Sequence, residues 1–215
     1  MERAGLRSSP SSMEDMTRQG YAASFTSERS LRHEVEVVLR LSANGMSWID
    51  VRKEVLARNL FQVRRTSTAQ TYLTLVRRRI VWLDERLRSL YLEGARSDTL
   101  AILLYTFLAS YRFPREFVLE ELRYGLRMGR SIITEEQIAA FFDRKREQHA
   151  DVAHWTTTSQ KKVAQVMVRI LRECGLLEPT SQEWRIQPLT ISHELDNYVR
   201  REPRHRYFLP LILIE

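Results

Sequence analysis

The sequence predicts a mainly α-helical protein made of two packed helical subdomains with helix-turn-helix elements, the second a winged helix with a short β-hairpin. Three observations support this. The 215 residues include only 7 Gly and 6 Pro, and long stretches contain neither. Apolar residues recur at helical spacing along most of the chain. Between about residues 114 and 191, three helical patterns precede two short strand-like runs, which is the element order of a winged helix.

The predicted domain organisation has three parts. Residues 1–20 carry Ser, Arg and Gly with almost no apolar content, which favours a disordered leader. Residues 21–95 form the N-terminal helical subdomain, with a helix-turn-helix-like pattern. Residues 96–215 form the C-terminal helical subdomain, which holds the winged helix-turn-helix and a tail.

Boundary residues predict where the first two helices begin and end. Thr26 or Ser27 can cap a helix whose apolar residues continue to about Ala43, and Asn44-Gly45 breaks it. Ser47 caps a shorter second helix that ends near Arg58.

A long third helix is predicted from Ser67 to about Glu93, followed by a stop at Gly94. Ser67 and Gln70 have the spacing of a capping box. The apolar residues then alternate in steps of four and three, as in a heptad seam. The seam could pack within the monomer or join two chains, and we expect it to pack within the monomer. Its residues are Ala69, Leu73, Val76, Ile80, Leu83, Leu87 and Leu90.

The second subdomain begins with a helix from Asp98 that is apolar on most sides and so belongs at the centre of the core. Phe113-Pro114 separates it from an amphipathic helix. Thr134 and Gln137 form another capping-box pattern at the start of the next helix.

The stretch HWTTTSQKKVAQVMVRILRECGLLEP, residues 154–179, predicts a helix with a hydroxyl-rich start and a left-handed stop at Gly175. Two short strands around a turn at Pro179 to Gln182 follow. The tail consists of a basic patch and then FLPLILI, which predicts an edge strand or a core plug.

The net charge of +7 and the sequence pI near 9.8 suggest an anionic partner, either nucleic acid or a membrane surface. The single cysteine, Cys174, excludes an internal disulfide and any cysteine-based zinc site. No apolar run reaches the roughly 18 residues of a membrane span, and the N-terminus lacks the apolar stretch of a signal peptide. We therefore expect a cytoplasmic protein without a membrane partner.

The start of the helix after His154 has the chemistry that nucleic-acid binding requires. Short hydroxyls and amides at a helix start can approach phosphates and base edges, and the helix dipole favours an anion there. Lysines just inside the helix would release counterions. The alternative is that the threonines are ordinary caps and the lysines solvated. The candidate DNA-binding residues are Thr157, Thr158, Ser159, Gln160, Lys161, Lys162, Arg169 and, on the predicted wing, Arg185.

A second candidate lies in the N-terminal half, where no acidic residue occurs between Glu54 and Asp84. Cations and hydroxyls again stand at a helix start, after two shorter helices. The alternative is a bundle helix whose arginines face solvent or pair with nearby glutamates. Of the two segments, the sequence favours the later one as the reader of DNA. The candidates here are Arg64, Arg65, Thr66, Ser67, Arg77 and Arg78.

Catalytic motifs are missing from the sequence. The glycines never cluster into a phosphate loop, and no nucleophile elbow occurs. His149 and His154 are five residues apart, which does not suit a shared metal on one helical face. We expect a nonenzymatic protein with no cofactor and no metal.

Three segments resemble the BrxA proteins of bacterial BREX phage-defence systems. They are SFTSERSLRHEVEVVLRL, RSDTLAILLYTFLASYRFPREFV and WTTTSQKKVAQVMVRILRECGLL, and the resemblance spans about residues 21–178. It implies an all-helical protein with winged or helix-turn-helix elements and no catalytic residues, which would bind nucleic acid beside other BREX proteins. Some members of the family are likened to the RNA-binding antitermination factors of NusB type.

Together, the residues and the resemblance predict a double-stranded DNA-binding component of BREX defence that contacts DNA largely through phosphates. Two alternatives remain open. One is an RNA-binding factor of NusB type, which the same basic surface would suit. The other is a scaffold that holds other defence proteins.

Overall fold

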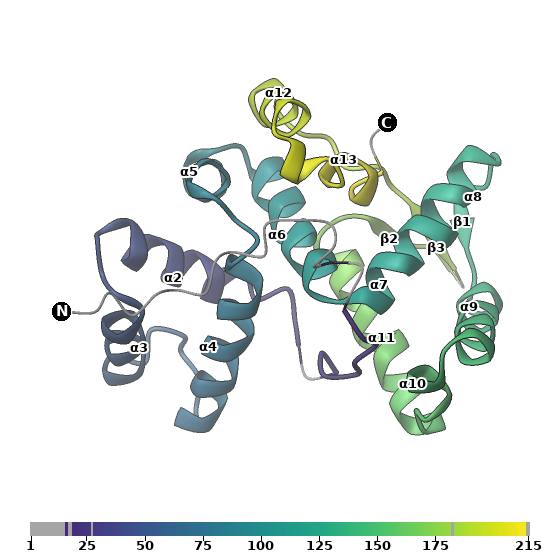
Figure 1. Cartoon of the computed structure of the whole chain (residues 1–215), viewed down its shortest axis with the longest axis horizontal. Helices are drawn as coiled ribbons and strands as arrows, with labels where there is room; N and C mark the ends of the chain where they lie inside the picture. The colour runs from purple at the N-terminus through teal and green to yellow at the C-terminus, as the bar shows by residue number, and fades with distance from the viewer. Residues whose placement is uncertain (1–15, 17–18, 27, 182, 214–215) are drawn as a thin grey trace.

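The computed structural model describes residue 16 and residues 19–26, 28–181 and 183–213, so most of the predicted leader lies outside the described residues. The chain is mainly helical (Figure 1), and its described part contains a three-stranded antiparallel sheet of order β1-β3-β2. No helix within the described ranges is both long and apolar enough to cross a membrane.

Three helices pack against one another in the N-terminal half: α2 (Arg32–Ala43), α3 (Trp48–Ala57) and α4 (Thr66–Ile80). The break at Asn44-Gly45 is confirmed, because Asn44 caps α2 and Gly45 has a positive φ of 81°. The cap at Ser47 is also confirmed, since its side chain accepts a hydrogen bond from the Asp50 amide at 3.2 Å.

The predicted start of the first helix near Thr26 is wrong. Helix α2 begins only at Arg32, after Leu31 in the left-handed conformation, and Ser27 lies outside the described residues. The reason is a buried arginine of α4. Arg79 donates hydrogen bonds to the backbone carbonyls of Arg29 at 2.8 Å and Ser30 at 2.5 Å, so these residues are held in a non-helical path.

The third helix differs from its prediction at both its start and its length. Arg65 precedes α4 in an extended conformation, with no side-chain cap, so the predicted capping box at Ser67 is absent. The predicted single helix is two helices, because α5 (Glu85–Glu93) begins anew at Asp84, whose carboxylate accepts from the Leu87 amide at 2.9 Å. The seam residues are nevertheless buried within the chain on both sides of this break.

Helix α6 (Arg96–Ser110) lies at the centre, as predicted, and it is almost wholly buried. Tyr111 ends it in an extended conformation. Phe113-Pro114 is not the separator that the sequence predicts, because both residues lie within α7 (Arg112–Phe117). Proline is tolerated there because the first turn of a helix leaves its N–H groups without intrahelical partners.

A π-helix, η1 (Val118–Arg123), and α8 (Tyr124–Arg127) continue the chain to β1 (Ile132–Ile133). The capping box at the start of α9 (Glu135–Gln148) is confirmed, with both of its reciprocal hydrogen bonds present. The short α10 (Ala150–Ala153) fills the connector to α11 (Thr157–Glu173), and Gly175 ends α11 with φ 86°, as predicted.

The predicted hairpin is present as β2 (Leu177–Pro179) and β3 (Trp184–Ile186). Strand β1 was not predicted, and it pairs with the other edge of β3 through Ile132 opposite Arg185.

The tail forms α12 (His193–Arg201), the short 3-10 helix η2 (Pro203–His205) and α13 (Phe208–Leu211). The prediction of a core plug is confirmed, since α13 is mostly buried, whereas the alternative of an edge strand is wrong. Buried side chains fasten the tail to the centre: Asp98 accepts from the Ser192 amide at 2.7 Å, and the His205 ring contacts the Asp84 carboxylate at 2.6 Å. Burial alone would raise the pKa of Asp84, but its hydrogen bonds from His205, Leu87 and Tyr198 hold that pKa below its usual value.

The segment before α2 joins the two halves of the chain. Glu28 and Arg79 form an ion pair whose side chains are both 0% exposed, and Tyr111 donates a hydrogen bond to the same carboxylate. From the other half, Arg169 donates to the Glu28 carbonyl, and Glu173 accepts from the Ser30 amide at 2.8 Å. The predicted boundary near residue 95 is therefore crossed by side-chain contacts.

Candidate nucleic-acid interface

The start of α4 presents cations and hydroxyls to solvent. Arg64, Arg65, Thr66 and Ser67 are all exposed. None of their side chains forms a hydrogen bond or an ion pair within the described part of the chain. The 15 residues of α4 include no acid. Its exposed polar face therefore carries only neutral and basic side chains, namely Thr66, Ser67, Gln70, Thr71, Thr74, Arg77 and Arg78.

The three arginines at the end of α4 have different surroundings. Arg77 is exposed and lies over the Trp48 ring, 5.2 Å from its centroid. Arg78 donates to the Tyr111 hydroxyl at 3.1 Å and to the Ser24 hydroxyl at 3.2 Å, so it also supports the N-terminal segment. Arg79 is buried. Its spacing from Tyr72, Leu75 and Val76 places it on the apolar face of the helix, and this signal could have separated it from its neighbours.

At the start of α11, part of the hydroxyl-rich stretch serves the helix itself. Thr156 is the N-cap, and its hydroxyl oxygen accepts from the Ser159 amide at 3.2 Å. Gln160 donates from Nε2 to the Trp155 carbonyl at 3.0 Å. Thr156 is therefore an ordinary helix cap, as the alternative interpretation of the sequence holds, and the Ser159 amide is its hydrogen-bond partner. Thr157, Thr158, Lys161 and Lys162 are exposed, with no hydrogen bond or ion pair to other described residues.

Two further predicted residues have structural partners. Arg169 binds the Glu28 carbonyl and lies 3.8 Å from the Glu173 carboxylate. Arg185 lies on β3, 3.7 Å from the Glu178 carboxylate across the hairpin, and both side chains are largely exposed.

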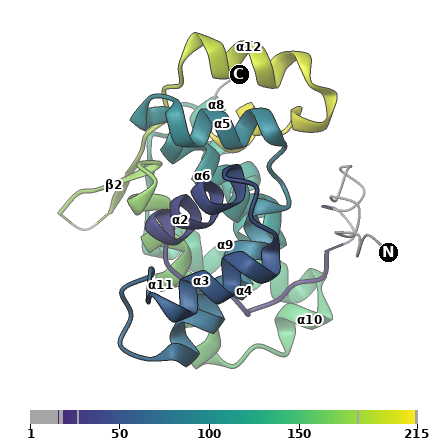
Figure 2. The ribbon, with the colours of Figure 1, turned by 90° about the vertical axis from the view of Figure 1, so that its left-hand side faces the viewer.

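The two helix starts lie at the same end of the molecule. Helices α4 and α11 both run upward in Figure 1, so that their first turns lie low in the view, and Figure 2 shows the same arrangement after the turn. The β2–β3 hairpin, by contrast, projects sideways at mid-height in Figure 2. The fold therefore brings the starts of α4 and α11 to one end, and the hairpin, whose strand β3 includes Arg185, lies apart from that end.

The start of α11 also borders a cavity of about 760 Å³ that α9, α11 and β3 line. One wall carries the acids Glu135, Glu136 and Asp143 of α9, and the other carries Lys161, Arg169 and Arg172 of α11. The floor is apolar, with Phe142, Val168 and Trp184 among its residues. Acids that line the same cavity as Lys161 weaken its attraction for a phosphate, whereas α4 contains no acid to oppose Arg64 and Arg65.

Chemically, unpaired cations at helix starts can bind phosphate oxygens. Backbone N–H groups and the helix dipole add to the attraction, and binding releases the counterions condensed on a nucleic acid. Two such starts at one end provide separate contacts for a long polyanion. Among the described residues, no group of three or more His, Cys, Asp or Glu side chains could hold a metal ion. Burial raises the pKa of the Cys174 thiol to about 12, so this cysteine is a buried apolar side chain.

Comparison with known proteins identifies relatives across most of the chain. The model of the BrxA family matches residues 19–202. A protein of Bacillus cereus (strain H3081.97) named BREX protein BrxA is 26% identical over 182 residues, which cover 85% of this chain and 91% of that protein. A crystal structure of an uncharacterized protein from Magnetospirillum magneticum superposes with a TM-score of 0.75 at 19% identity. It covers 89% of this chain and 97% of that one.

Proposed function

The chain belongs to the BrxA family, and on that premise we propose that it is a nonenzymatic component of BREX phage defence that binds double-stranded DNA. The observation that supports DNA binding best is the position of four exposed cations without partners in the described part of the chain. Arg64 and Arg65 precede α4, Lys161 and Lys162 lie in the first turns of α11, and both starts lie at one end of the molecule.

We also infer that residues 112–186 are a winged helix-turn-helix. The order helix, β1, α9, α11, β2, β3 supports this, as does the antiparallel sheet of order β1-β3-β2. In such a module, α11 is the helix offered to the major groove, and the hairpin lies beside it. One feature departs from the pattern, since α10 occupies the connector between α9 and α11.

The N-terminal helices α2, α3 and α4 supply the second contact. Helix α4 follows α3 after a loop whose arginines are exposed, and its polar face carries threonines, a glutamine and arginines without an acid. Hydroxyl, amide and guanidinium groups can donate to phosphate oxygens, and amides and guanidinium groups can also read base edges. The two helix starts would therefore hold a duplex mainly by its phosphates, with modest sequence preference.

A gel-shift series with the full chain tests this proposal. Duplex DNA of unrelated sequences, single-stranded DNA and duplex RNA are compared over a range of salt concentrations. The proposal requires similar affinities for unrelated DNA duplexes and a steep fall in affinity with salt.

The same series separates the alternatives. Stronger binding of RNA than of duplex DNA would support the RNA-binding factor of NusB type. If no nucleic acid binds at low salt, or if the affinity does not change with salt, DNA binding is wrong and the scaffold within the defence complex becomes the better account.

A further inference from the structure

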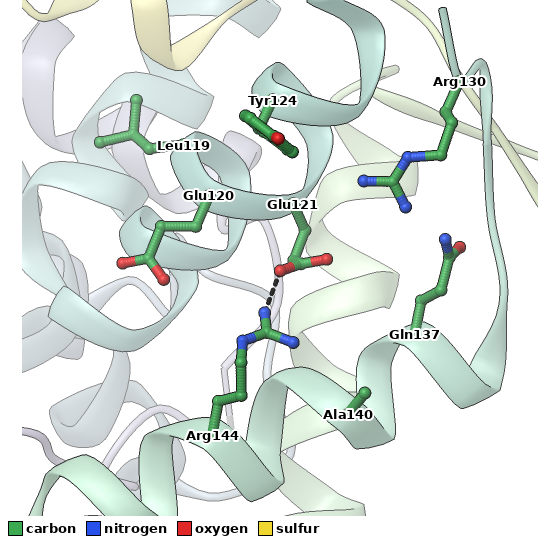
Figure 3. A pocket seen from close by; sticks show the side chains of 8 residues that line it. All are labelled: Leu119, Glu120, Glu121, Tyr124, Arg130, Gln137, Ala140 and Arg144. Atoms are coloured by element: carbon green, nitrogen blue, oxygen red, sulfur yellow. Dashed lines mark hydrogen bonds and ion pairs between the residues drawn. The ribbon is translucent and has the colours of Figure 1, made fainter. Parts of the chain in front are cut away.

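We propose that a cavity between η1 and α9 docks an acidic side chain of a partner protein, with an apolar neighbour of that side chain resting on α8. The cavity has a volume of about 710 Å³. Figure 3 shows the side chains of Glu121, Arg130, Gln137 and Arg144 directed into the space between the two helices. This site lies on elements that the proposed DNA contacts of α4 and α11 do not use.

The charges around the cavity are balanced except at one position. Glu121 forms an ion pair with Arg144. Glu120 pairs at 2.7 Å with Lys145, which also pairs at 2.6 Å with Glu116, and Glu116 in turn pairs with Arg112 at 2.6 Å. The Arg130 guanidinium has no hydrogen-bond or ion-pair partner among the described side chains. Arg130 therefore leaves one uncompensated positive charge at the edge of a partly enclosed space, which attracts a single carboxylate.

Backbone geometry explains why Arg130 faces the cavity. Helix α8 ends at Arg127 with Met128 as its C-cap, and Gly129 follows with φ 78°, a conformation that L side chains rarely adopt. The turn brings the Arg130 amide back to the Gly125 carbonyl at 2.8 Å. The side chain then lies against Gly125, where an added Cβ would be 3.6 Å from the guanidinium. This packing limits the freedom that the side chain would lose on binding.

A second donor faces the same space. The Gln137 side chain uses its carbonyl oxygen to accept from the Thr134 amide at 3.0 Å, which completes the capping box of α9. Its Nε2 group has no partner within the described ranges. Because the capping box fixes the side chain, this amide is held in place beside the cavity that Arg130 borders (Figure 3).

Two exposed apolar side chains extend from the cavity along α8. Tyr124, which lines the cavity, is 55% exposed, and Met128, four residues further along at the C-cap of α8, is 63% exposed. Among the described residues, Tyr124, Met128 and Ile49 are the exposed large apolar side chains, and Ile49 lies elsewhere, on α3. Tyr, Met and Arg are the residue types enriched in protein interfaces.

These features favour a protein over a small acid or a nucleic acid. Met128 is exposed and does not line the cavity, so a small ligand within the cavity would leave it uncovered. A nucleic acid would bring several phosphates past Glu120 and Glu121, which lie within the cavity lining. One Asp or Glu side chain with an apolar neighbour could bind Arg130 and cover Tyr124 and Met128 together. The π-helix beside the cavity is consistent with a binding role, because π-helical turns are frequent at functional sites.

Photo-cross-linking tests the site directly. The full chain carrying Tyr124→benzoylphenylalanine is expressed in cells with the complete BREX system, irradiated, and its cross-linked peptides are mapped by mass spectrometry. We expect a protein cross-link whose peptide contains Asp or Glu beside an apolar residue. Cross-links to nucleic acid, peptides without an acid, or no protein cross-link would each overturn the proposal.

A charge-reversal variant provides the second part of this test. With Arg130→Glu added, the cross-link yield should fall at least about tenfold, and a Lys in place of the partner's acid should restore it. The matched control, Arg52→Glu at an exposed arginine of α3 outside both proposed sites, should leave the yield unchanged. Arg130→Glu should keep the DNA affinity and melting temperature of the parent chain. An undiminished yield in the folded Arg130→Glu chain would contradict the proposal without affecting that of DNA binding.

Discussion

The starts of α4 and α11 carry similar residues in different surroundings. Each places two cations and several hydroxyls at a helix start. At α11, Thr156 caps the helix, and Lys161 shares a cavity with three acids of α9. At α4, no side chain caps the helix, and Arg64 and Arg65 have no partners in the described chain. The same pattern of cations and hydroxyls can therefore cap the helix at one start and leave its side chains available to a ligand at the other.

The largest expected effect follows from reversing the charges at α4. Arg64→Glu with Arg65→Glu should weaken duplex DNA binding by on the order of 100-fold at low salt, if each lost contact is worth about 1.4 kcal/mol. The folded state should hardly change, because both side chains are exposed. Fluorescence anisotropy and a thermal melt measure the two quantities. An unchanged affinity would exclude the start of α4 from the interface.

The same reversal at α11 should have a smaller effect. Lys161→Glu with Lys162→Glu should weaken binding by on the order of tenfold, because the acids of α9 already offset part of the field of Lys161. A loss larger than that of the α4 variant would reverse the comparison and make α11 the main reader.

Removing the acids should act in the opposite direction. Glu135→Gln with Glu136→Gln should raise the affinity for duplex DNA by a few-fold, because it frees Lys161 from opposing charge. The matched control is Asp50→Asn, which removes an acid of α3 that lies outside the cavity. This variant should change the affinity for duplex DNA less than the double variant does. Titrations at one fixed salt concentration make the comparison. Equal affinities of wild type and the double variant would show that these acids do not act on the DNA.

The smallest effect concerns the hydroxyls. Thr156→Ala should lower the free energy of unfolding by about 1 kcal/mol, as expected for a lost N-cap. Thr66→Ala with Ser67→Ala should change it by less than about 0.5 kcal/mol, because neither hydroxyl caps α4. Urea denaturation distinguishes the two. If both variants lose the same stability, the hydroxyls of α4 have a structural role that the fold does not show.

Local signals predicted much of the fold. The capping box of Thr134 and Gln137 and the left-handed Gly175 lie where the sequence indicates, because both depend on neighbouring residues alone. The division between α4 and α5 was missed because a heptad seam reports which side chains are buried, whereas Asp84 decides where the backbone starts a new helix. Strand β1 was missed because its two residues form a strand only by pairing with β3.

The residues of the candidate site remain a prediction from the sequence, and the structure adds the surroundings that the sequence could not show. The sequence favoured the lysines of α11 over the arginines of α4. It could not show that α9 would bring Glu135 and Glu136 beside Lys161, because this depends on tertiary packing. The sequence also could not show that Arg169 binds the Glu28 carbonyl, whereas its basic neighbours on α11 face solvent. We therefore expect the start of α4 to contribute more to DNA binding than the start of α11. Arg169 and Arg185, which have structural partners, are not among the four cations on which the proposal rests.

The most direct test of the central claim is the salt dependence of DNA affinity in the chain that carries Arg64→Ala, Arg65→Ala, Lys161→Ala and Lys162→Ala together. If each side chain contacts one phosphate, the slope of log affinity against log salt should become shallower by about 3.6, at about 0.9 per contact. A folded variant whose slope stays within about 0.9 of the wild-type value would contradict the claim that these two helix starts bind the duplex.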